Sequence, residues 1–257
     1  MGAQTGSFKT AFRAEMLKGR RGGARKVALV APLPFCALGV LSSGVLQGTG
    51  AVGGIATSMW NYWMALMLPI AVALICASVA NLDGRQKLRP VLGLPLPPAR
   101  TWWAKVAYAL ALVLGANLVV LACSTVLTAL GAEGPSFAEG LAAAVLLTLA
   151  SSWMVPAALA LTLRFGTLAG IAIPALAQVG VGIALWTSGA WFAFPPATTL
   201  CAVAPLLGVA PSGVPLEAGD ALGTFGGDAV LGIAVALALF AALAILGAAW
   251  FSKREAA

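Results

Sequence analysis

The chain has 257 residues, of which 61% are hydrophobic and only 9% are charged, and its formal net charge is +7. Soluble domains carry close to 25% charged residues, so this composition excludes an ordinary soluble protein. The basic residues stand in blocks between apolar runs, which is typical of an integral membrane protein and not of a soluble nucleic-acid-binding surface.

The residue types also exclude several kinds of chemistry. The sequence has no histidine, which removes the commonest general base and the commonest metal ligand. Its four cysteines stand singly without CxxC spacing, so we interpret them as small buried apolar residues. A GxxxxGK[ST] phosphate loop does not occur. We therefore expect no catalytic site, no metal site and no cofactor in this chain.

Residues 1–26 form a basic arm with seven Lys or Arg and a single acid, Glu15. Phe8 and Phe12 are four residues apart and share one face of a helix, while basic residues occupy the other faces. This pattern predicts an amphipathic helix lying in the cytoplasmic interface and anchored by the two phenylalanines. The alternative is a solvated basic tail. The apolar run that follows lacks a clear cleavage site, so we interpret it as an uncleaved span.

Six apolar runs follow the arm, each near the ~20 residues that a helix needs to cross a bilayer core. None has Asp, Glu, Lys or Arg in its interior, which argues against a carrier coupled to protons or sodium ions. We expect the uncharged Asn117 and Gln178 to form hydrogen bonds between helices. The sequence thus predicts an all-α bundle of six transmembrane helices, at 27–46, 60–80, 106–130, 140–163, 167–186 and 229–251.

The segments between these runs predict the orientation. All fifteen Lys and Arg fall in the arm, the 81–105 loop, the turn at Arg164 and the 252–257 tail. The positive-inside rule places these segments, and with them both termini, in the cytoplasm. The segment 187–228 falls on the outer side and holds five prolines and a semi-apolar run, which predicts a helical hairpin dipping into the membrane. A plain outer loop is the alternative.

The loop 81–105 is the longest basic connector between spans. It contains a charged stretch from Asp83 to Arg89, a proline-rich corner ending in PPAR at 97–100, and then Trp102, Trp103 and Lys105. Such a charged stretch, stiff corner and aromatic anchor suit the transmission of force from a docked cytoplasmic partner. A loop whose charges only set the topology is the alternative.

These features together resemble a known family. An acid and a basic cluster after the second span, PPxR, an aromatic pair and a lysine opening the third span resemble the permease subunits of type-2 ABC exporters. The F-x-x-E-x-x-K motif at Phe12, Glu15 and Lys18, with Trp63 and Pro69 in the second span, is most similar to the lantibiotic (bacteriocin) self-immunity permeases. The family usually has Glu where this chain has Asp83.

The resemblance implies one permease subunit of an exporter in the cytoplasmic membrane of a bacterium. Its partners would be a second permease copy or homologue and two ABC ATPase subunits, which would bind ATP and magnesium. The cargo would be amphipathic, such as a lantibiotic or other antimicrobial peptide, or a drug-like or lipid-like molecule. The implied coupling surface is Asp83, Arg85, Lys87, Arg89 and Arg100, and the implied interfacial anchors are Phe8, Phe12, Trp102, Trp103 and Lys105.

Three further interpretations remain open at this point. The outer acids would attract a cationic cargo, or they would only reflect topology. The alternative to a permease is a non-transporting sensor or scaffold whose basic loop recruits a partner or anionic lipid. An integral membrane enzyme is disfavoured by the missing histidine. The outer acids are Glu133, Glu139, Glu217, Asp220 and Asp228.

Overall fold

The computed structural model describes residues 7–37, 55–84, 97–217 and 219–254. Helices make up most of these residues, and the only strand-like pairing among them is an isolated antiparallel bridge between Val209 and Pro215. The longer elements are α1 (Phe8–Lys18), α2 (Gly23–Val30), α4 (Ile55–Tyr62), α5 (Leu68–Gly84), α7 (Pro98–Ala129), α8 (Phe137–Ala150), α9 (Met154–Phe165), α10 (Thr167–Leu185) and α13 (Gly227–Arg254). The fold is therefore all-helical, as the sequence predicts.

Several helices are long and apolar enough to cross a membrane. Four qualify in the described part of the chain: Thr57–Asp83, Pro98–Ala129, Thr167–Leu185 and Gly227–Lys253. The pair α8 and α9 would make a fifth span, bent by 43° at a short break. The predicted first span, 27–46, lies partly outside the described residues. The chain is a multi-pass, membrane-embedded helical protein, and the sixth span stays a prediction.

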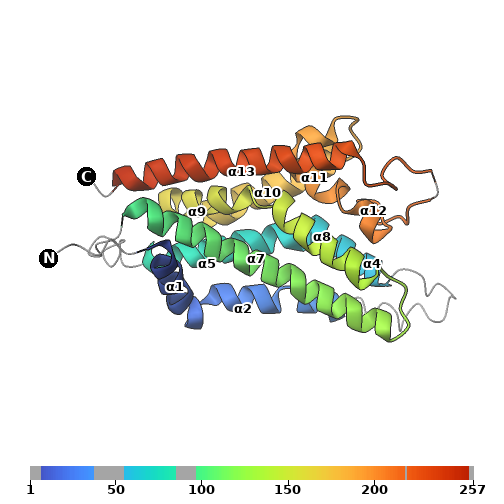
Figure 1. The fold of residues 1–257 in the computed structure, drawn as a ribbon, viewed down its shortest axis with the longest axis horizontal. Coiled ribbons are helices and arrows are strands. Elements are labelled where there is room, and N and C mark those ends of the chain that lie inside the picture. The colour runs from blue at the N-terminus through green and yellow to red at the C-terminus, as the bar shows by residue number, and fades with distance from the viewer. Residues whose placement is uncertain (1–6, 38–54, 85–96, 218, 255–257) are drawn as a thin grey trace.

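The arm differs in detail from the single helix expected over residues 1–26. It contains α1, a short 3-10 turn η1 (Gly19–Arg21), and the start of α2, which begins before the predicted span. Ser7 caps α1 by accepting a hydrogen bond from the Thr10 backbone N–H, and Gly22 takes the extended backbone conformation that separates η1 from α2. α1 runs across the end of the bundle at which α13 also ends (Figure 1).

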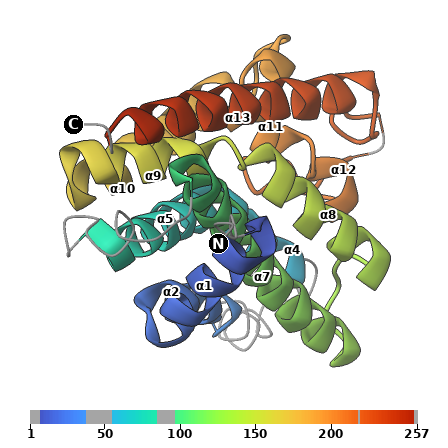
Figure 2. The same ribbon diagram turned by 60° about the vertical axis from the view of Figure 1, so that its left-hand side comes forward.

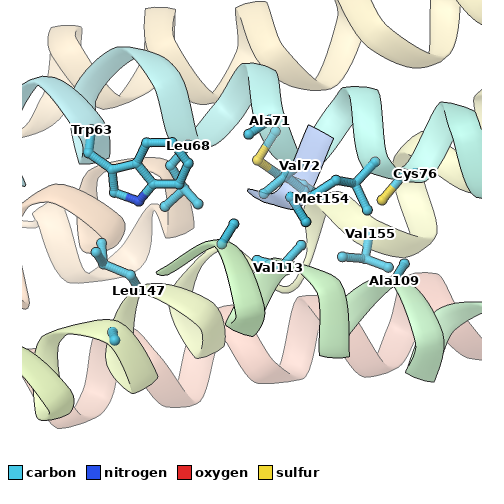
Figure 3. Close-up of a cluster of buried hydrophobic side chains, with 14 of the residues drawn as sticks. Trp63, Leu68, Ala71, Val72, Cys76, Ala109, Val113, Leu147, Met154 and Val155 are labelled. Atoms are coloured by element: carbon cyan, nitrogen blue, oxygen red, sulfur yellow. The ribbon is translucent and has the colours of Figure 1, made fainter. Parts of the chain in front are cut away.

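The core lies around α5, which packs against α2, α7, α9 and α10. Its membrane-spanning stretch is 67% buried, whereas that of α13 is 22% buried. A helix that is apolar on every side is expected at such a central position. In both views α13 and α2 lie on opposite sides of the molecule, with α5 and α7 between them (Figures 1 and 2). Figure 3 shows α5 side chains such as Val72 and Cys76 facing Val113, Met154 and Val155.

Two irregular stretches interrupt the long helices. A π-helical turn, η3 (Trp63–Met67), joins α4 to α5, with Pro69 at the second position of α5, where its missing N–H loosens the helical ladder. In the outer segment, η4 (Trp191–Ala193), α11 (Pro195–Cys201) and α12 (Ala204–Leu207) fold back against the bundle, and every residue of α11 is buried. The predicted dipping of this segment into the membrane as a helical hairpin stays a prediction.

Candidate functional site

Four charged side chains from three helices form a buried ion cluster. Glu15 and Lys18 come from α1, Asp83 from the last turn of α5, and Lys105 from the second turn of α7. Glu15, Asp83 and Lys105 are 1%, 2% and 0% exposed, so bulk water does not compensate their charges. We call these four residues the ion cluster.

Each ammonium group of the ion cluster contacts both carboxylates. Lys18 Nζ lies 3.0 Å from Glu15 Oε1 and 3.1 Å from Asp83 Oδ1. Lys105 Nζ lies 2.9 Å from Glu15 Oε2 and donates a further hydrogen bond to Asp83 Oδ2. Two positive and two negative charges thus alternate in a closed ring, and the ring is neutral as a whole. This arrangement is the one that makes buried charges tolerable.

The charge state of the ion cluster follows from these contacts. Burial alone would lower the pKa of Lys18, but the adjacent carboxylates of Glu15 and Asp83 outweigh it and raise that pKa above its ordinary value. The Lys18 ammonium therefore stays charged at neutral pH.

Helix spacing explains part of this arrangement. Glu15 and Lys18 are three residues apart and so face the same side of α1. On the same helix the rings of Phe8 and Phe12 stack with their centroids 6.3 Å apart. Asp83 ends α5, and Lys105 lies near the start of α7, so the ion cluster joins the two ends of the segment between these helices.

A second set of contacts fastens α2 and α1 to α7 beside the ion cluster. Arg25 on α2 donates one hydrogen bond to Tyr108 Oη (3.1 Å) and another to the Met16 carbonyl (2.7 Å). Gly19 passes so close to this tyrosine that a Cβ atom there would lie 2.1 Å from Tyr108 Oη. Only glycine allows this approach without a shift of the ring.

A third set of contacts fastens α7 to α13. Trp102 is fully buried, and its indole N–H donates a 2.9 Å hydrogen bond to the Ala244 carbonyl. Its ring packs against Phe251 at a centroid distance of 5.9 Å and occupies the space above Gly247, where a Cβ would lie 2.2 Å from the indole. Helices α1, α5, α7 and α13 are thus joined at one end of the bundle.

The structure places the predicted coupling residues in different surroundings, and some of them lie outside the described part of the chain. Arg85, Lys87 and Arg89 lie outside the described residues. Asp83 is buried within the ion cluster, which differs from its expected place on an exposed coupling surface. The physical reason is that two lysines surround the carboxylate, so its charge is satisfied internally. Arg100 is half-buried and lines a groove beside α1.

The predicted interfacial anchors also divide into two groups. Phe8, Phe12 and Trp103 keep part of their surface exposed, as an anchor at a membrane interface requires. Trp102 and Lys105 are 0% exposed, so within this chain they are internal contacts and not anchors in lipid. Their helical positions explain the difference, because Trp102 faces α13 and Lys105 faces the ion cluster, while Trp103 faces outward.

The predicted role of the two amides within the spans is confirmed. Asn117 accepts a 2.8 Å hydrogen bond from the Trp63 indole and donates one of 2.9 Å to Thr148. Gln178 accepts a 3.1 Å bond from the Trp153 indole and donates one of the same length to the Pro196 carbonyl. Both amides are buried and join helices that are distant in sequence.

The far end of the bundle holds a cavity of about 560 Å³ between the end of α10 and the start of α13. Asp228, Trp186 and Trp191 are among its lining residues. Of the outer acids named above, Asp228 is the one in this lining. In the described residues no group of three or more Cys, Asp or Glu is placed to hold a metal ion.

Sequence reasoning missed the pairing that forms the ion cluster. It singled out Glu15, Lys18, Asp83 and Lys105 separately, as parts of a motif, a coupling surface and an anchor. One available signal was that Asp83 and Lys105 each adjoin a long apolar stretch, where an unpaired charge is costly.

Comparison with known proteins adds no assignment to this geometry. No protein-family model, curated protein or solved structure matches the chain. A function is therefore argued from the chain's own residues.

Proposed function

We propose that the chain is the membrane permease subunit of an ATP-driven ABC exporter in a bacterial cytoplasmic membrane. A second permease copy or homologue would complete the translocation pathway, and two separate ATPase subunits would supply the energy by binding ATP with magnesium. The cargo would be an amphipathic molecule such as a lantibiotic or another antimicrobial peptide, or a drug-like or lipid-like compound.

The ion cluster is the observation that carries the proposal. It joins α1 to both helices that border the basic segment 85–97, through contacts of 2.9 to 3.3 Å involving buried carboxylates. A force applied to that segment would therefore move α1, α5 and α7 together instead of bending one of them. Interiors with packed, satisfied contacts transmit displacement in this way because they have low compressibility.

The chemistry of the spans supports an external energy source. The apolar runs of the sequence carry no Asp, Glu, Lys or Arg in their interior, and coupled carriers usually keep such groups at mid-membrane. The chain also lacks a Walker-type phosphate loop, so ATP hydrolysis would belong to a partner. These two features favour a permease driven by separate ATPases over a proton-coupled or sodium-coupled carrier.

In the mechanism that we infer, ATP would draw the two ATPases together beneath a pair of permeases. The basic segment with Arg85, Lys87 and Arg89 would receive this movement, and the ion cluster would pass it to α1, α5 and α7. Trp102, inserted against α13, would carry the same movement to the last helix. The pathway between the two permeases would then open toward the opposite side.

The test uses vesicles that contain the chain together with a Walker-A ATPase encoded by an adjacent reading frame. We expect the two proteins to copurify, and charge reversal of Arg85, Lys87 and Arg89 to Glu should lower both copurification and ATPase turnover at least about tenfold. Reversal of Lys9, which is exposed on α1 and outside the loop, is the matched control.

Unchanged copurification and turnover in the triple variant would refute the coupling role. A different outcome is that the ATPase copurifies but its turnover is changed neither by the permease nor by the candidate peptide. This outcome would favour the scaffold or sensor, in which the loop recruits a partner without transport.

A further inference from the structure

A narrow groove of about 290 Å³ runs along α7 between α1 and α13. Four of its lining residues on α7 are at positions 100, 103, 107 and 110, and this spacing of three, four and three places them in one stripe along the helix. Phe8 of α1 and Phe240 of α13 also line it. The groove is therefore built by three helices that are far apart in the sequence.

The length and polarity of the groove match one leaflet of a bilayer. Ten residues separate Arg100 from Leu110, which corresponds to about 15 Å along a helix. This is about half of the ~30 Å hydrocarbon core. Arg100 and Trp103 lie toward the start of α7, and the deeper lining is formed by Ala107, Leu110 and other apolar side chains. A tryptophan next to a basic residue is typical of the headgroup level.

The charge of the groove selects among lipids. Arg100 is the only charged side chain among the described residues that line it. Arg100 lies in the first turn of α7. A guanidinium binds phosphate oxygens in pairs, and basic groups at this level attract anionic headgroups.

We propose that this groove binds one anionic phospholipid from the cytoplasmic leaflet. The phosphate would contact Arg100, and one acyl chain would lie along Ala107 and Leu110 against Phe240. Because Phe8 belongs to the helix that carries Glu15 and Lys18, the bound lipid would also hold α1 against α13. This inference goes beyond the proposed function, since it concerns the chain alone and requires neither an ATPase nor a cargo.

The experiment is native mass spectrometry of the purified full chain, titrated separately with dioleoyl phosphatidylglycerol and dioleoyl phosphatidylcholine. We expect the first phosphatidylglycerol to be retained at a concentration about fivefold lower than the first phosphatidylcholine. Arg100→Gln should abolish this preference. Leu110→Trp should fill the deep part of the groove and weaken retention of both lipids, and Ala107→Trp is the second groove-filling variant. Arg13→Gln, on the exposed face of α1, should behave as wild type.

Thermal unfolding of each variant shows whether it is folded, and only folded variants are compared. The proposal is overturned if wild type retains both lipids equally, or if Arg13→Gln removes the preference as fully as Arg100→Gln, since general basic attraction would then explain it. Wild-type retention by both folded groove-filling variants would likewise place the lipid elsewhere.

Discussion

Removal of one carboxylate from the ion cluster would leave a buried ammonium without its counter-charge. Lys105 is fully buried and contacts only Glu15 and Asp83 among the ion pairs of the described residues. Breaking a buried pair by removal of one partner costs about 3–5 kcal/mol, whereas removal of both partners costs much less. The residues of the cluster are therefore energetically coupled.

We predict that Asp83→Asn lowers the free energy of unfolding by about 3–5 kcal/mol, measured as a loss of thermal stability in detergent. Adding Lys105→Met should restore part of this loss, because Glu15 and Lys18 then remain as a neutral pair. Glu133→Gln, at an exposed acid remote from the cluster, serves as the control and should change stability by less than about 0.5 kcal/mol. Additive losses in the double variant would show that the cluster is not a coupled unit.

At the scale of helices, the sequence predicts where a helix forms better than it predicts which helices contact one another. The apolar runs indicate the long helices, and Asn117 and Gln178 are correctly predicted to join them, because a buried amide must find a partner. The ion cluster is different, because the sequence around Asp83 and Lys105 does not predict that α1 packs against them. The spacing of Trp102 and Trp103 likewise does not say which ring faces α13. Such facts depend on how the helices pack, which single-sequence periodicity does not contain.

The contact among η3, α7 and α8 offers a test of this packing. We predict that Asn117→Leu destabilises the protein by about 1–2 kcal/mol, because the Trp63 indole N–H loses its acceptor inside the bundle. The matched control is Asn81→Leu, whose amide donates a single 3.0 Å bond to Thr167 at an exposed site. Thermal unfolding in detergent measures both. An equal effect at the two positions would mean that the buried amide has no special structural role.

At the scale of the whole molecule, the distribution of charge and the fold both distinguish the two ends of the helical bundle. α1, with its basic residues, lies at the end of the bundle where α13 terminates near Lys253, and the outer segment with α12 lies at the other end (Figure 1). The positive-inside rule predicts that the first of these ends faces the cytoplasm. Because the ion cluster lies at that end, the proposed coupling also requires this orientation.

Cysteine labelling in intact cells tests the orientation directly. Glu133→Cys places a thiol on the exposed turn before α8 and leaves the Ser136–Glu139 cap of that helix unchanged, and Arg13→Cys places one on the exposed face of α1. The parent chain is the background control, because Cys36, Cys76 and Cys201 are buried and Cys123 is half-buried. We predict that a membrane-impermeant maleimide labels the thiol at position 133 in intact cells, whereas the thiol at position 13 reacts only after permeabilisation. Labelling of both from outside, or protection of position 133, would contradict the orientation, and the ion cluster would then lie on the side of the membrane without ATP.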